Sequence, residues 1–87
     1  NAWILAAVAD NQNTDLETLK HIVIDKRADA GTLAAVAYNE NMMDPDTLGW
    51  IVINNASLFD KETWEFIKQK MELVLLQTNS QDGIKLK

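Results

Sequence analysis

Two features of this chain have residue types that could carry chemistry: the one histidine and a carboxylate run around Asp44. A histidine can act as a general base or a metal ligand, but both roles need partners. His21 has no other histidine and no cysteine to share a metal with, and no motif places a serine beside it. It aligns with Trp50 in the repeat described below. We therefore expect His21 to lie on a packed or solvated surface.

The segment Asp44-Pro45-Asp46, together with Glu40, resembles the start of a calcium-binding loop. Such a loop also needs a glycine at its turn and a closing glutamate, and both are missing here. Helix capping explains the same carboxylates. The three glycines lie too far apart to form a phosphate-binding loop. The sequence therefore predicts a protein that is not an enzyme and that binds no cofactor and no metal.

The composition excludes several partners. The 87 residues are 47 % hydrophobic and carry a net charge of −5, with eight scattered cations. That charge balance disfavours binding to nucleic acid or to an anionic membrane surface, and no apolar run reaches the ~18–20 residues that span a bilayer. The lack of cysteine is compatible with any compartment. We favour the cytoplasm, with secretion as part of a larger protein as the alternative.

The strongest pattern is an internal repeat, which points to a stacked architecture. The segment LAAVADNQNTDLETLKHIVI, from Leu5, returns as LAAVAYNENMMDPDTLGWIVI, from Leu33. The offset is 28 residues up to Asn41 and 29 afterwards, because the second copy carries one extra residue. A third, partial copy begins at Asp60 and lacks the Ala-rich first half. Units too small to bury their own apolar face are stable only when stacked.

Each copy contains a segment with the start signal and the period of an α-helix. Asp15, Asp44 and Asp60 stand at the N-cap position, where a carboxylate accepts hydrogen bonds from free backbone N–H groups. Pro45 suits the first helical position. Apolar residues then recur every three or four positions, which predicts a buried stripe. The third helix is the longest; we expect it to end near Leu76 and to close the array.

The Ala-rich segments Ala2–Ala9 and Ala30–Tyr38 are predicted to be short helices that end in asparagine-containing turns. The β-rich tetrapeptides HIVI and WIVI would suit strands. Both follow a capped helical start without an intervening turn, so we expect helix there. The predicted fold class is all-α: about five helices stacked as two and a half helical hairpins, an armadillo-like α-solenoid with a long C-terminal capping helix.

These segments also define the expected domain organisation. One repeat domain covers residues 1–76, with repeats at about 5–32 and 33–56 and a partial repeat at 57–76. Residues 77–87 are polar and are expected to form a flexible tail.

The run Ala7-Val8-Ala9-Asp10-Asn11-Gln12-Asn13-Thr14, followed by Leu19, resembles the leucine-rich variant repeat of bacteria, AVA-x-N-P-N-T-P-x-x-x-L. Ala35-Val36-Ala37-Tyr38-Asn39-Glu40-Asn41 is similar. Both copies lack the proline between the asparagines, and Met42-Met43 replaces Thr-Pro. HEAT-like and armadillo-like arrays are the alternatives. The resemblance implies short 3₁₀-helices alternating with longer α-helices in a superhelical scaffold whose function lies on its surface.

Four asparagines form two equivalent turns: Asn11, Asn13, Asn39 and Asn41. We expect them to end helices and to hydrogen-bond between repeats. The alternative is a ladder of amides on one rim that binds a peptide backbone.

The expected function is non-catalytic binding of another protein or a peptide. The candidate partner-binding surface combines bulky groups that break the repeat, Tyr38, Met42, Met43 and Trp50, with His21. The alternative for the bulky groups is core filling. Because the chain begins with Asn1, we expect it to be the terminal part of a larger bacterial protein. Two other functions stay open: an accessory or cap domain that supports a catalytic region elsewhere, and an all-α nucleic-acid or membrane module. The sequence leaves the oligomeric state open.

Overall fold

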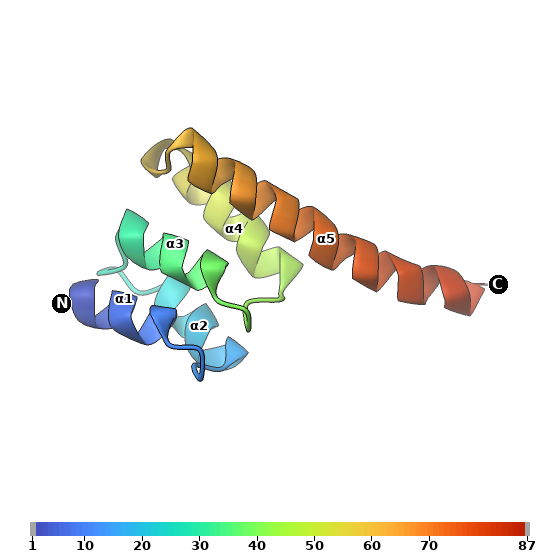
Figure 1. Cartoon of the computed structure of the whole chain (residues 1–87), viewed down its shortest axis with the longest axis horizontal. Helices are drawn as coiled ribbons and strands as arrows, with labels where there is room; N and C mark the ends of the chain where they lie inside the picture. Colours follow the sequence, from blue (N-terminus) through green and yellow to red (C-terminus); the bar gives the residue numbers. More distant parts are fainter. Residues whose placement is uncertain (1, 87) are drawn as a thin grey trace.

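The computed structural model describes the backbone of residues 2–86 and the side chains of residues 3–77. Within that part the chain is all helical, with no strand, so the predicted all-α class is confirmed. The elements, in chain order, are α1 (Ala2–Asp10), α2 (Leu16–Val23), α3 (Ala30–Tyr38), α4 (Pro45–Asn55), the short 3₁₀-helix η1 (Ala56–Leu58) and α5 (Lys61–Leu86) (Figure 1). The tetrapeptide HIVI forms the end of α2 and its C-cap, and WIVI lies inside α4, so neither is a strand.

Aspartates stand at the starts of four helices. Asp15 precedes α2 and accepts a hydrogen bond from the backbone N–H of Thr18 at 2.9 Å. Asp60 precedes α5 and accepts one from the N–H of Thr63 at 2.8 Å. Each carboxylate pairs one of the N–H groups that a helix start leaves free.

The other two starts differ from what the sequence suggested. Asp44 precedes α4 without a bond to the backbone, and its carboxylate accepts from the Thr47 hydroxyl at 2.6 Å. Asp29, which the sequence analysis did not single out, caps α3 by accepting from both the N–H and the hydroxyl of Thr32 at 2.9 Å.

The helices differ from expectation in two further ways. The Ala-rich segments are α-helices of 9 residues each, so they are not the short 3₁₀-helices that the resemblance implied. The long last helix does not end near Leu76. The backbone of α5 continues to Leu86, through the segment expected to be a tail. That segment contains no proline, and extending an existing helix adds one hydrogen bond for each residue fixed.

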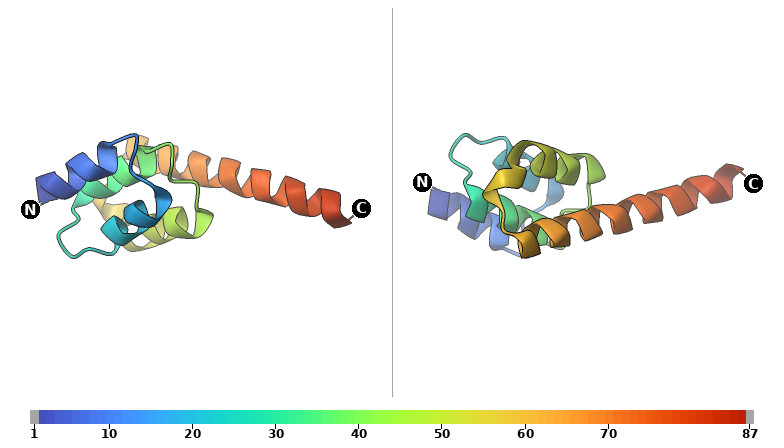
Figure 2. Two further views of the ribbon diagram at one scale, coloured as in Figure 1. Left: turned by 90° about the horizontal axis from the view of Figure 1, so that it is seen from below. Right: turned by 90° about the horizontal axis from the view of Figure 1, so that it is seen from above.

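The helices form two layers and a closing element. α1 and α3 pack side by side, α2 packs against α4, and both views of Figure 2 show the pairs in separate layers. α5 lies along α4, contacts α3 and then projects beyond the body (Figure 1). The core between them is aliphatic, as expected from the predicted stripes. Its fully buried members with large side chains include Leu19, Val36, Met42, Leu48, Ile51 and Ile67.

A buried asparagine joins the two copies of the repeat. Asn39 is 6 % exposed, and its Nδ2 donates to the carbonyl of Ala9 at 2.8 Å and to that of Asn11 at 2.9 Å. Its Oδ1 accepts from the backbone N–H of Asn41 at 2.8 Å. One amide therefore fixes its own turn and holds that turn to the preceding one.

Asn41 repeats the contact at the rim. Its Nδ2 donates to the carbonyl of Gln12 at 2.9 Å and to that of Thr14 at 2.8 Å. The two amides together donate to four backbone carbonyls between residues 9 and 14, so the turns of the two copies are aligned in register.

At the far side of the second copy, a lysine takes the place of an asparagine. Lys70 of α5 donates from Nζ to the carbonyl of Ala37 at 2.6 Å and to that of Asn39 at 2.7 Å. These carbonyls correspond, 28 residues on, to those of Ala9 and Asn11. Burial lowers the pKa of the Lys70 ammonium below its ordinary value. The same carbonyl pair is therefore bonded in both copies, by an amide in one and by an ammonium in the other.

None of the helices in the described residues combines the length and the hydropathy needed to cross a bilayer.

We predict that Asn39→Asp lowers the free energy of unfolding by about 3 kcal/mol or more, because it leaves a buried and a part-buried carbonyl without a donor and faces them with a charge. The substitution keeps the Oδ1 that accepts from Asn41. Asn11→Asp is the matched control, because Asn11 is the equivalent residue but is exposed; its effect is expected to stay within about 0.5 kcal/mol. Urea unfolding followed by circular dichroism measures both, and equal losses would contradict the account.

We predict that stability falls as the pH is lowered through the carboxyl range. Hydrogen bonds from Thr18 hold the pKa of Asp15 below its usual value of 3.8, and the Thr63 N–H does the same for Asp60. A carboxyl whose pKa is lower in the folded state stabilises the fold above its unfolded pKa and stops doing so as it is protonated. The double variant Asp15→Asn, Asp60→Asn keeps both caps and removes both titrations. Thermal unfolding should show a shallower decline between about pH 5 and pH 2 than in the parent, and an unchanged slope would contradict this assignment.

Candidate functional site

The five residues expected to form one partner-binding surface do not share a face. His21 and Trp50 line a hollow of about 450 Å³ between α2 and α4. Tyr38 and Met43 line another, of about 380 Å³, beside α5. The two hollows have no lining residue in common. The expected surface is therefore divided into two sites.

Met42 belongs to neither hollow. Its side chain is completely buried in the aliphatic core, whereas the neighbouring Met43 is 44 % exposed. The expectation that Met42 lies on the binding surface is wrong, and the alternative of core filling applies to it. The extra residue of the second copy falls in this turn, where one methionine points inward and the next points outward.

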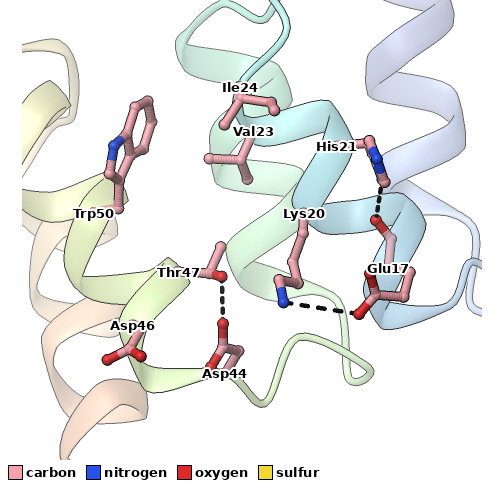
Figure 3. A pocket seen from close by; sticks show the side chains of 9 residues that line it. All are labelled: Glu17, Lys20, His21, Val23, Ile24, Asp44, Asp46, Thr47 and Trp50. Atoms are coloured by element: carbon pink, nitrogen blue, oxygen red, sulfur yellow. Dashed lines mark hydrogen bonds and ion pairs between the residues drawn. The ribbon is translucent and has the colours of Figure 1, made fainter.

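The hollow between α2 and α4, called the α2–α4 groove from here on, combines apolar walls with an acidic rim. Trp50 and Ile24 supply exposed apolar surface, and Val23 lies buried at its base. Figure 3 shows Trp50 on the α4 side, Lys20 projecting between the helices, and His21 with Glu17 on the far side of α2.

Repeat-equivalent residues line both sides of the groove. His21 corresponds to Trp50, and Glu17 to Asp46, each at an offset of 29 residues. The same helical face of both copies is therefore turned toward this opening, which is why both a histidine and a tryptophan line it.

The charges of the groove are mainly negative. Three carboxylates line it, those of Glu17, Asp44 and Asp46. Lys20 is the one lysine or arginine among the lining residues, and its Nζ lies 3.7 Å from the Glu17 carboxylate. Among the described side chains, the two carboxylates on the α4 side, Asp44 and Asp46, form no ion pair with a lysine or arginine.

His21 is oriented by its own helix. Its Nδ1 lies 2.8 Å from the carbonyl oxygen of Glu17. A carbonyl oxygen can only accept, so Nδ1 carries the proton and donates, which leaves Nε2 as the ring nitrogen available to a partner. The exposed ring suits hydrogen bonding to a bound chain.

The groove does not resemble a metal site. One carboxylate oxygen of Asp44 accepts the hydrogen bond from the Thr47 hydroxyl. The described side chains include no group of three or more histidine, cysteine, aspartate or glutamate residues placed to hold an ion. Asp44 and Asp46 lie at the start of α4, where a negative charge is favourable to the helix dipole.

The second hollow lies between the α3–α4 turn and α5. The rings of Tyr38 and Phe66 pack with their centroids 4.3 Å apart, and Met43 and Leu73 supply further exposed apolar surface. Lys70, which lines this hollow, is already bonded to two carbonyls of α3 and its turn. Phe66 and Lys70, which line this hollow, therefore hold α5 against α3 and its turn.

Several residues that shape these sites were missed at the level of sequence. Ile24 ends α2 and was counted only as part of an apolar tetrapeptide, although 68 % of it is exposed. Lys70 was not singled out in the sequence, and no local pattern identifies the carbonyl pair that it meets. The 28-residue offset could have located that pair, because it relates Ala37 and Asn39 to Ala9 and Asn11.

Comparison with models of protein families, with characterised proteins and with solved structures found no match to this chain.

We predict that Met42→Ala lowers the free energy of unfolding by about 2–5 kcal/mol, because it leaves a cavity in the core. Met43→Ala, one residue away and exposed, should change it by about 0.5 kcal/mol or less. Met42→Leu, which nearly conserves volume, should cost less than about 1.5 kcal/mol. Chemical denaturation of the three variants tests this order, and a larger effect at Met43 than at Met42 would show that the two side chains are exchanged.

Proposed function

We propose that this protein is a non-catalytic interaction module that binds an extended segment of another protein in the α2–α4 groove. The observation that carries the proposal is the groove itself: an exposed indole and an exposed isoleucine line it together with the carboxylates of Asp44 and Asp46, which form no ion pair among the described side chains. Large exposed aromatic groups in concave sites are common anchors of protein recognition.

The chemistry of the groove specifies the partner. Trp50 and Ile24 would pack against a large apolar side chain, and the carboxylates of Asp44 and Asp46 would attract a lysine or arginine nearby. The chain's net charge of −5 would favour the approach of a basic segment and repel an acidic one. The proposed partner is therefore a peptide segment in which apolar and basic residues lie close together.

The proposed architecture behind the groove is a short α-solenoid. Two observations support it: α1 and α3 form one layer while α2 and α4 form the other, and equivalent turns are joined by equivalent hydrogen bonds. In this arrangement each copy contributes the same helical face to the groove, and α5 closes the last copy as a capping helix. Exposed sites on a rigid stack of this kind are ordered without a ligand.

The test is selection from a random peptide library displayed on phage, with the immobilised full chain as target. We expect enriched peptides that combine a large apolar residue with lysine or arginine, and Trp50→Ala should weaken their binding at least about tenfold, the equivalent of about 1.4 kcal/mol. Trp3→Ala is the matched control, because Trp3 is also exposed but lies outside the groove.

Charge provides a second arm of the same test. Asp46→Lys should weaken the selected peptides, and added salt should weaken them in the parent more than in the variant. The proposal fails if the selected peptides bind Trp50→Ala as tightly as the parent, or if binding depends on Trp3 instead.

A further inference from the structure

The face of α1 that points away from α3 is exposed where the equivalent face of α3 is buried. Ile4 is 48 % exposed, whereas its equivalent Thr32 is fully buried. Val8 is 39 % exposed, whereas its equivalent Val36 is fully buried. α3 owes this burial to α1, which packs on it more extensively than any other element does. The first copy thus presents, uncovered, the surface that in the second copy is an interface.

The polar groups of this face repeat the same contrast. Asn11 Oδ1 accepts from the Asn13 backbone N–H at 2.8 Å, the same bond that Asn39 makes with Asn41. The first turn therefore has the geometry that aims the amides of the second turn. Among the described residues, however, neither Asn11 Nδ2 nor Asn13 Nδ2 has an acceptor, although the equivalent groups each bond two carbonyls.

We propose that this face, formed by Ile4, Val8, Asn11 and Asn13, is a docking surface for one further repeat of the same type. The occupant is a short Ala-rich helix with its turn, stacked on α1 as α1 is stacked on α3. It supplies two pairs of backbone carbonyls, spaced like those that Asn39 and Asn41 bind, and small side chains that cover the exposed aliphatic groups.

A second copy of this chain does not fit the face. In such a copy, the carbonyls of the first turn already accept hydrogen bonds from Asn39 and Asn41. The carbonyl pair of the second turn already accepts hydrogen bonds from Lys70. Two α1 faces related by a two-fold axis would oppose the same patches to each other, so donors would meet donors. The face requires acceptors, and a repeat whose own turn is free provides them.

This surface is distinct from the α2–α4 groove, and the two share no residue. The inference therefore does not rest on the proposed peptide binding, and each can fail without the other.

The test is an extended chain in which residues 2–29 are duplicated directly ahead of Ala2, so that the natural connection between the copies is kept. If the added copy docks, backbone amides of the original α1 should exchange with solvent at least about tenfold more slowly than in the unextended chain. Circular dichroism should show a matching gain in helix. Unchanged exchange in α1, together with the gain in helix that shows the added copy to be folded, would overturn the proposal.

A matched variant separates docking from a simple lengthening of the chain. In the extended chain, Asn11→Asp is made in the original copy only. It keeps the acceptor for the Asn13 N–H and removes the donor to the added copy, so it should abolish most of the slowing. The same substitution in the unextended chain should change the exchange of α1 by less than about twofold. Slowing that persists in the extended Asn11→Asp variant would show that the amides do not hold the added copy, and would overturn the proposal.

A second extension covers the case in which that copy fails to fold. Residues 30–55, followed by 24–29 as the connection, are placed ahead of Ala2 instead, so that the second repeat supplies the acceptors. Slowing in this chain supports the proposal, and the absence of slowing in both extended chains overturns it.

Discussion

The structure depends on hydrogen bonds between the turn of one copy and the asparagine amides of the next. Turns between short helices leave carbonyl oxygens exposed, and burying them without donors would cost free energy. The Asn39 amide satisfies two such carbonyls while fixing its own turn, so helix ends can approach one another inside a packed body. The aliphatic core lies between helices whose register these hydrogen bonds fix.

This bonding has a direction, and the direction accounts for the two ends of the molecule. Donors on each turn point toward the preceding copy and acceptors point toward the following element. At the second copy, Lys70 of α5 meets the acceptors with a single ammonium, and the helix that carries it closes that end. At the first copy the donors remain exposed. Within the described residues, the same constraint thus explains why α5 covers the second copy while the outer face of α1 is exposed.

Much of this architecture could be predicted from the sequence, because the repeat and the capping aspartates are local patterns. The start of α4 at Pro45 follows from the aspartate pattern, and the start of α3 at Ala30 follows from the Ala-rich segment of the repeat. What could not be predicted depends on three-dimensional contact. The inward turn of Met42 and the outward turn of Met43 follow from one inserted residue, and the role of Lys70 follows from a carbonyl pair far away in the chain. His21 and Trp50 line one hollow and Tyr38 and Met43 line another, and this separation depends on how the helices pack.

The most direct test of the central claim is NMR detection of scalar coupling across hydrogen bonds from the Asn39 side-chain nitrogen. The account predicts couplings from Asn39 Nδ2 to the carbonyl carbons of Ala9 and Asn11, with slow solvent exchange of the Asn39 amide protons. The Asn11 amide, which has no such acceptors among the described residues, should exchange rapidly. Absence of these couplings, with equal exchange rates for the two side chains, would contradict the account.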